Sequence, residues 1–196
     1  MKNLYLDGEE RFGPATSLLY DLVRRMRGLH GIHTFVASDL AKSKVKAMLD
    51  VGCGPMPVAL LAWHSKGPEI YCVDPSVDMV RLAKKNSKGN SKVRVALGSS
   101  RHVPFAGKFG LIYSSLSFHH WQDKSGSLRY LKSRLGKSGE IRIYDYIKSD
   151  SWIRRALGIE SHAVNMKELD DAAEKAGLRI TGIVNDGKLA RISLKA

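Results

Sequence analysis

From about residue 46 onward, short apolar stretches alternate with stretches whose apolar residues recur every three or four positions. The short stretches predict strands, and the periodic ones predict amphipathic helices. This alternation is typical of a parallel sheet covered by helices on both faces. The last two predicted strands meet at Asp186-Gly187, a hairpin signal that makes the last strand antiparallel to its neighbour. We therefore expect an α/β fold: a doubly wound, mostly parallel seven-stranded sheet with a C-terminal antiparallel hairpin and helices on both faces.

The 196 residues allow one domain with a sizeable core. Residues 1–45 are predicted to be a helical extension that packs on this core. In it, an apolar stripe between Leu18 and Met26 ends at Gly28 and Gly31, and a second helix covers residues 34–44. Residues 46–196 form the main part of the domain. Its strands are predicted at residues 45–51, 69–74, 92–97, 108–115, 140–146 and in the hairpin, and its helices at residues 57–67, 76–86, 123–135 and 166–177.

The chain has a formal net charge of +13, which is concentrated in its middle third. Residues 79–139 hold thirteen basic side chains and one acidic one, Asp123. A field of one sign attracts polyanions, so RNA is a candidate partner; a solvated basic face that aids solubility is the alternative.

Cys53 and Cys72 form no CxxC pair and no zinc pattern, so we expect no metal site and two reduced, buried thiols. The N-terminus lacks a secretory signal, and no apolar run is long enough to cross a bilayer. These features predict a cytoplasmic protein with no membrane association.

The strongest chemical signal is the stretch DVGCGPMP, residues 50–57, at a predicted strand-to-helix turn. Gly52 and Gly54 let the backbone turn tightly and approach a ligand closely. Asp74 ends the next predicted strand, where a carboxylate can accept both hydroxyls of a ribose. A dinucleotide fingerprint would need glycine or alanine where this chain has Pro57, so a dehydrogenase is disfavoured.

Four stretches, MLDVGCGP, VDPSVDMV, FGLIYSSLSFHHW and LGKSGEIRIYDY, resemble the successive motifs of class I S-adenosylmethionine-dependent methyltransferases. They are most similar to the small "type 11" branch, which includes quinone-biosynthesis enzymes. The resemblance extends from about residue 46 to the C-terminus and implies S-adenosyl-L-methionine as cofactor. It further implies that the cofactor lies against Asp50, Gly52, Cys53, Gly54, Asp74, Pro75, Ser99, Ser100, Ser114 and Ser115.

Three positions depart from the family pattern. Met56 replaces a frequent third glycine and is expected to narrow the pocket. Around Ser99, an acidic residue that usually meets the adenine amino group is missing, and Gly110 replaces the acidic residue that commonly opens the fourth strand. Each change is expected to weaken cofactor binding modestly.

His119 and His120 follow the fourth predicted strand, at the mouth of the expected site. Either could remove a proton from the methyl acceptor. Packing of His120 and exposure of His119 to water is the alternative. Tyr144 and Asp145 are weaker candidates for the same role.

A short segment between residues 147 and 164 leaves room for little more than a small lid, which favours a bulky acceptor. The sequence therefore predicts a methyltransferase whose acceptor is RNA, a ribosomal substrate or another anionic macromolecule. A methyltransferase of small metabolites and a non-catalytic binding protein with the same fold remain the alternatives.

Overall fold

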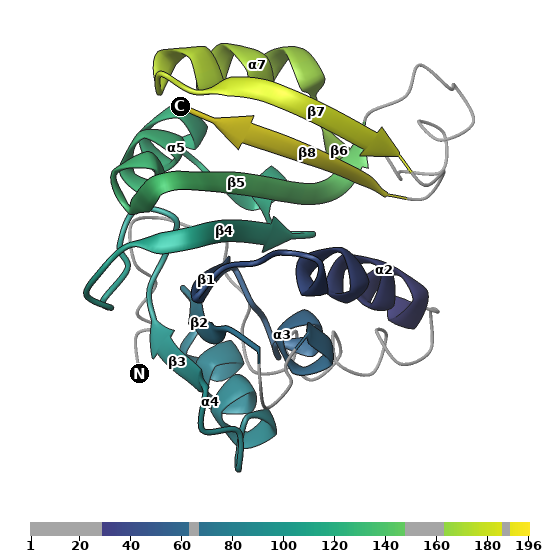
Figure 1. The fold of residues 1–196 in the computed structure, drawn as a ribbon, viewed down its shortest axis with the longest axis vertical. Coiled ribbons are helices and arrows are strands. Elements are labelled where there is room, and N and C mark those ends of the chain that lie inside the picture. Colours follow the sequence, from purple (N-terminus) through teal and green to yellow (C-terminus); the bar gives the residue numbers. More distant parts are fainter. Residues whose placement is uncertain (1–28, 63–66, 148–162, 186–188) are drawn as a thin grey trace.

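The computed structural model describes residues 29–62, 67–147, 163–185 and 189–196. Helices and strands alternate through this part of the chain as the sequence predicts (Figure 1). No helix within these ranges is long and apolar enough to cross a membrane. In chain order the elements are α2 (Leu29–Ala41), β1 (Ala47–Val51), α3 (Pro57–Ala62), β2 (Glu69–Asp74), α4 (Val77–Asn86), β3 (Val93–Leu97), β4 (Phe109–Ser115), η1 (Phe118–His120), α5 (Lys124–Ser133), β5 (Leu135–Ile147), β6 (Ala163–Val164), α7 (Met166–Lys175), β7 (Arg179–Asn185) and β8 (Ala190–Lys195).

The main strands form one sheet in the order β3-β2-β1-β4-β5-β8-β7 (Figure 1). Neighbours from β3 to β5 run parallel, whereas β8 is antiparallel to both β5 and β7. The predicted doubly wound sheet with seven main strands is thus confirmed, and the two-residue strand β6 is added beside the end of β5. The strand order reverses between β1 and β4, and sheets of this kind bind ligands beyond the carboxyl ends of the strands at that point.

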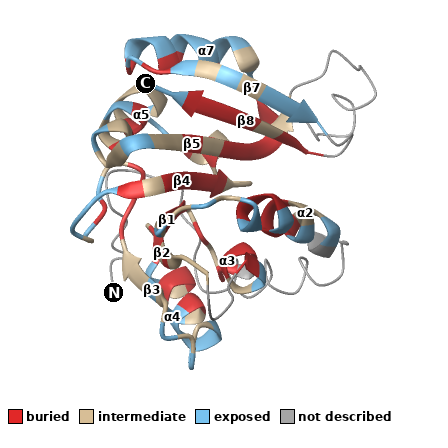
Figure 2. Cartoon of the chain, viewed as in Figure 1, coloured by how far each residue is buried: buried red, intermediate tan, exposed pale blue. Residues whose placement is uncertain are grey.

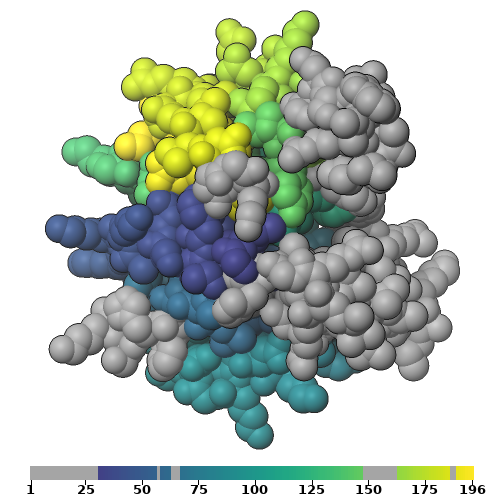
Figure 3. All heavy atoms as spheres, turned by 90° about the vertical axis from the view of Figure 1, so that its right-hand side faces the viewer, coloured from purple at the N-terminus to yellow at the C-terminus, as the bar shows by residue number. Residues whose placement is uncertain are grey.

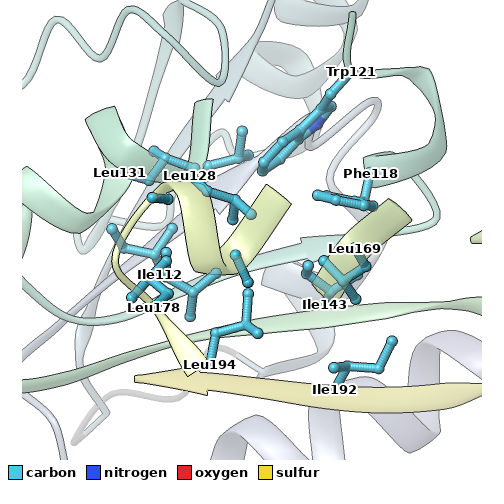
Figure 4. Packing of buried hydrophobic residues seen from close by; sticks show 14 of the residues in the cluster. Ile112, Phe118, Trp121, Leu128, Leu131, Ile143, Leu169, Leu178, Ile192 and Leu194 are labelled. Atoms are coloured by element: carbon cyan, nitrogen blue, oxygen red, sulfur yellow. The ribbon is translucent and has the colours of Figure 1, made fainter. Parts of the chain in front are cut away.

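Side chains that alternate along the strands divide the core into two clusters. Figure 2 shows buried residues on the central strands and on the helices that cover them. Ile112 of β4 packs into a cluster under α5 and α7, shown in Figure 4. Its neighbours Leu111 and Tyr113 pack into a second cluster, which also takes in residues of α2 and α3. Both faces of the sheet are therefore covered, which explains why the strands read as nearly continuous apolar runs.

α2 starts earlier than the sequence predicts. Gly31 lies inside this helix, so the prediction that it ends a helical segment is wrong. The buried residues Val36, Ala37 and Leu40 hold α2 against the core, and this packing outweighs the cost of about 1 kcal/mol of an exposed helical glycine. The predicted stripe between Leu18 and Met26 lies outside the described residues.

β5 also starts earlier than predicted. Leu135, assigned from the sequence to the preceding helix, instead pairs with Phe109 as the first residue of β5. The register then shifts, because the next pair joins Leu111 to Glu140. The irregular stretch between these two pairs contains three glycine or serine residues, which the sequence pattern does not mark as strand. The predicted hairpin turn at residues 186–187 and the short lid segment lie outside the described residues.

Candidate functional site

A pocket opens at the carboxyl edge of the sheet, where β1, β2 and β4 end. Figure 3 looks onto the side of the molecule towards which β4 points in Figure 1, and α2 crosses this side between α4 and the C-terminal strands. Three predicted site residues, Ser99, Ser114 and His119, are not among the pocket-lining residues. The predicted residues that line the pocket are Asp50, Gly52, Cys53, Gly54, Asp74, Pro75, Ser100, Ser115 and His120.

The turn after β1 depends on glycine at two positions. Gly52 has a φ of +77°, and its backbone N–H donates to the carbonyl of Val73 at 2.9 Å. A Cβ at Gly52 would lie 1.8 Å from Oγ of Ser117, so no other residue fits there without moving the loop after β4. Gly54 has a φ of +51°, and a Cβ on it would meet no atom within 4 Å. The backbone at Gly54 is therefore open to close approach by a ligand.

Hydrogen bonds to Asp74 connect this turn to the end of β2. Its carboxylate accepts the backbone N–H of Gly54 at 2.8 Å and that of Ser76 at 2.9 Å. The side chain is buried, and burial raises its pKa to about 6 although both hydrogen bonds lower it. Each carboxylate oxygen can accept more than one hydrogen bond, so Asp74 retains acceptor capacity for a ligand in the pocket.

Asp50 is a second buried carboxyl group on the pocket wall. Burial, together with the negative charge of Asp74, raises its pKa to about 7, although the nearby Tyr113 side chain lowers it. Two carboxyl groups with raised pKa values in one pocket are characteristic of a functional site. A ligand that donates hydrogen bonds or carries positive charge would favour their ionised forms.

The four predicted serines occupy different surroundings. Ser100 lines the pocket and shares a hydrogen bond of 2.7 Å with Ser127. Ser99 is buried behind the lining, where its hydroxyl accepts the N–H of Arg101 and helps to form a turn. The hydroxyl oxygens of Ser114 and Ser115 are buried and have no hydrogen-bond partner among the described residues, and Ser115 lines the pocket. An unsatisfied buried hydroxyl at a pocket wall suggests a ligand partner.

His119 and Asp145 form a hydrogen-bonded pair beside the pocket. Nδ1 of His119 lies 2.8 Å from one carboxylate oxygen of Asp145 and 3.0 Å from the other. Asp145 lies on β5 and is fully buried. Burial raises its pKa, although the hydrogen bond to His119 lowers it. The imidazole of His119 is only 8% exposed, so the alternative that it faces water is wrong. The ring of His120 contacts it in a tilted arrangement, with 4.0 Å between the ring centroids, and lines the pocket.

Residues around η1 hold both histidines in place. Phe118 and Trp121, which flank the two histidines in the sequence, are buried in the core cluster (Figure 4). Lys124 donates to the carbonyl of Trp121 at 3.1 Å and pairs with Glu168 of α7 at 3.1 Å. The two histidines are thus carried by a short segment that is anchored at both ends, as the positioning of an acid–base group requires.

Comparison with known proteins agrees with this geometry. Residues 49–143 match the family model described as "Methyltransferase domain". This match runs from within β1 into β5. It contains the turn that Asp74 stabilises and every described pocket-lining residue except His33, which belongs to α2. Residues 49–143 form a class I S-adenosylmethionine-dependent methyltransferase domain. No curated protein matches the chain.

The methyltransferase fold is also found in solved structures. A putative O-methyltransferase from Nostoc punctiforme is 17% identical, with a TM-score of 0.76 over 96% of this chain and 63% of that one. An O-methyltransferase from neocarzinostatin biosynthesis, solved with S-adenosyl-L-homocysteine and 1,4-dihydroxy-2-naphthoic acid, is 18% identical, with a TM-score of 0.68 over 93% and 58%. A putative methyltransferase in complex with the Trm112 activator of Haloferax volcanii is 17% identical, with a TM-score of 0.71 over 93% and 96%. The chain thus spans only about 60% of the first two proteins.

The pocket of this methyltransferase domain suits S-adenosylmethionine, the cofactor that the family uses. The open backbone at Gly54, the acceptor oxygens of Asp74 and the unsatisfied hydroxyl of Ser115 offer the kinds of contact that a ribose and an amino-acid group need. Among the described residues, no group of three or more His, Cys, Asp or Glu side chains could hold a metal ion.

Two of the departures from the family pattern lie away from the pocket. Met56 has a φ of +56° and is fully buried in the cluster under α2 and α3, so the prediction that it narrows the pocket is wrong. Gly110 lies near the start of β4, at the far edge of the sheet. A Cβ there would come within 2.8 Å of Val45, which explains the glycine.

Several residues that line the pocket are not predicted as site residues from the sequence. His33 comes from α2, and Leu116, Ser117 and Trp121 come from the loop after β4. Leu116 has a φ of +54°, an uncommon conformation that occurs at functional sites. The stretch SSLSFHHW, already singled out, contains the last three residues, whereas no local signal marks His33.

No lysine or arginine is among the described residues that line the pocket. Lys84 and Lys85 lie in the last turn of α4, and the first residues of that helix are at the pocket edge. Arg129 and Lys132 donate to the carbonyls of Lys175 and Gly177, at the C-terminal end of α7. Part of the positive charge therefore stabilises a helix end.

Proposed function

We propose that this chain transfers the methyl group of S-adenosylmethionine to a hydroxyl oxygen, with His119 as the base and Asp145 as the residue that orients it. The observation that carries the proposal is the 2.8 Å contact between Nδ1 of His119 and the buried carboxylate of Asp145, one residue from the pocket wall.

In this proposal Asp50, Gly52, Cys53 and Gly54 hold the methionine part of the cofactor. Asp74 accepts the ribose hydroxyls beside Pro75, Ser99 and Ser100 lie on the adenine side, and Ser114 and Ser115 lie near the sulfonium group. Ser100 and Ser115, which face the pocket, make direct contacts. When bound, the cofactor supplies a methyl group on a positively charged sulfur, which leaves with the electron pair of the carbon–sulfur bond.

A hydroxyl acceptor must lose its proton to become methylated, and His119 is the base that removes it. Asp145 accepts a hydrogen bond from Nδ1–H, which leaves the lone pair on Nε2 and sets the tautomer of a base. Nε2 takes the hydroxyl proton as the oxygen bonds to the methyl carbon, and the carboxylate of Asp145 stabilises the imidazolium that forms. A neutral amine acceptor needs no such base, so the pair favours an acidic hydroxyl.

The acceptor class follows from the same site. Two similar structures bear the name O-methyltransferase, and one of them contains a dihydroxynaphthoic acid. Together with the absence of lysine and arginine from the described residues that line the pocket, this supports a small phenolic or enolic acceptor as the first candidate.

An RNA acceptor is the second candidate, supported by the excess of basic side chains in residues 79–139. In that case log K for RNA binding falls with log[salt] at a slope near −3 if about four phosphates are neutralised. Charge reversal at the exposed residues Lys84, Lys85 and Lys88 would reduce the slope.

A methyl-transfer assay with labelled cofactor, run on phenolic compounds, total RNA and protein fractions, tests the proposal. We expect label in the phenolic fraction. His119→Ala should lower kcat about 100-fold or more, whereas His102→Ala, which removes an exposed histidine outside the pocket, should leave kcat unchanged. Label in RNA alone would overturn the acceptor class. Binding of S-adenosylhomocysteine without transfer to any fraction would indicate a non-catalytic binding protein.

A further inference from the structure

The amino-acid part of S-adenosylmethionine carries a carboxylate as well as an ammonium group. Its ammonium group suits the acidic pocket wall, where Asp50 and Asp74 are buried. The carboxylate needs a hydrogen-bond donor instead, since a carboxylate next to two acidic residues without one would be repelled. Among the described residues that line the pocket, two side chains can carry positive charge, His33 and His120.

His33 lies on the side of the pocket formed by the turn after β1. It is 3% exposed and belongs to α2, which packs against α3. One helical turn further on, Val36 is buried in the same cluster as Cys53, Met56 and Val58, which belong to the glycine turn and the start of α3. His33 thus faces the part of the pocket that the methionine group is proposed to occupy.

His120 lies on another wall. It lines the pocket together with Ser115, the last residue of β4, and Trp121, where the sulfonium group is proposed to lie. A cationic partner for the carboxylate at that wall would also stand beside the positively charged sulfur, which is unfavourable. His33 avoids this conflict.

α2 is held rigidly enough to position such a contact. Asp39, on the same helix, accepts the hydroxyl of Tyr144 at 2.6 Å. It also forms ion pairs with Arg142 at 3.1 Å and with Arg191 at 2.7 Å, which come from β5 and β8. This network joins α2 to two strands of the sheet, so the wall that carries His33 is part of the folded domain.

We infer that His33 is a cofactor-binding residue whose ring N–H donates to the carboxylate of the methionine group. Both the neutral and the protonated imidazole carry at least one N–H, so the side chain has a donor in either protonation state. The inference rests on the proposed function for its ligand, and it assigns to α2 a role in recognition that reaches beyond the matched domain, residues 49–143.

Calorimetry with S-adenosylmethionine and its decarboxylated analogue tests the inference, because the two ligands differ only in the carboxylate. We expect the wild type to bind S-adenosylmethionine about tenfold or more tightly than the analogue. His33→Ala should remove most of this preference by weakening the binding of S-adenosylmethionine alone. His33→Gln, which keeps an N–H donor, should restore part of it, and Ser38→Ala, at an exposed position of the same helix, should change neither affinity.

The outcomes separate this inference from the proposed function. Failure of the folded wild type to bind either ligand would refute the cofactor assignment itself. Equal losses for both ligands in His33→Ala would show that His33 only shapes the pocket, and an unchanged preference would show that the carboxylate is held elsewhere. Either of the last two results would overturn the inference and leave the methyltransferase assignment intact. Thermal unfolding of each variant confirms that the comparison is made on folded protein.

Discussion

The carboxylate of Asp74 accepts the backbone N–H of Gly54 at 2.8 Å, across twenty residues of sequence. This bond joins the turn after β1 to the end of β2, so the two strongest sequence motifs of the chain form one wall of the pocket. A single carboxylate therefore stabilises the glycine turn and lines the pocket, so its removal is expected to have two consequences.

Asp74→Ala should weaken the binding of S-adenosylhomocysteine by roughly 1.5–3 kcal/mol, because hydrogen bonds to a charged acceptor are lost. It should also lower the free energy of unfolding by about 1–3 kcal/mol, since the N–H groups of Gly54 and Ser76 lose their partner. Calorimetry and urea unfolding measure the two effects. An unchanged affinity in the folded variant would show that Asp74 is a structural cap only.

Gly52→Ala should disrupt the pocket, because the new Cβ would lie 1.8 Å from Oγ of Ser117 in a backbone conformation with a φ of +77°. We expect loss of measurable cofactor binding and a lower melting temperature. Gly89→Ala is the matched control: its φ is +91°, but no atom lies within 4 Å of the added Cβ. That variant should show only the backbone cost of about 1 kcal/mol and retain binding. Equal behaviour of the two variants would contradict the close approach of the two loops.

The raised pKa of Asp50 predicts that the free energy of unfolding depends on pH. Burial raises its pKa to about 7 from 3.8, so the folded protein holds a proton that the unfolded chain releases between these values. The stabilisation associated with this proton is complete below the unfolded pKa and is lost as pH rises through 7. In urea unfolding at about pH 5 and pH 8, Asp50→Asn should therefore lose less stability than the wild type on going to the higher pH. If the wild type lost no more unfolding free energy than Asp50→Asn between these two pH values, the pKa of Asp50 would lie near its ordinary value.

Asp39→Ala should lower the free energy of unfolding by about 2–4 kcal/mol, because it leaves Arg142, Arg191 and Tyr144 without their shared acceptor in a mostly buried site. Asp78→Ala removes an exposed ion pair with Arg81 and should cost less than about 1 kcal/mol. Urea unfolding of both variants compares the two costs. A similar small effect in both would show that the network does not hold α2 on the sheet.

Local patterns account for most of the fold and for part of the site. The sequence predicts a helix that starts at residue 76, and Ser76 caps α4: its hydroxyl accepts the N–H of Met79. A helix cap depends on neighbours in the sequence, so it can be predicted locally. Leu135 shows the limit: its spacing fits the preceding helix, but pairing with Phe109 on another strand decides its structure.

The same limit applies to the site. The motifs identify Asp50, Gly54 and Asp74 because strand ends and glycine turns are local features. His33 reaches the pocket only because α2 packs on α3 and Asp39 bonds to two distant strands. Such long-range contacts leave no periodic or spacing signal, so the contribution of α2 could not be predicted.

Titration calorimetry with S-adenosylhomocysteine and NAD tests the central claim most directly. The wall formed by Gly54 and Asp74, together with the absence of a third glycine at Pro57, predicts that S-adenosylhomocysteine binds at one site and that NAD does not bind. Folded protein that binds NAD as tightly as S-adenosylhomocysteine, or that binds S-adenosylhomocysteine not at all, would contradict the assignment of this pocket to S-adenosylmethionine.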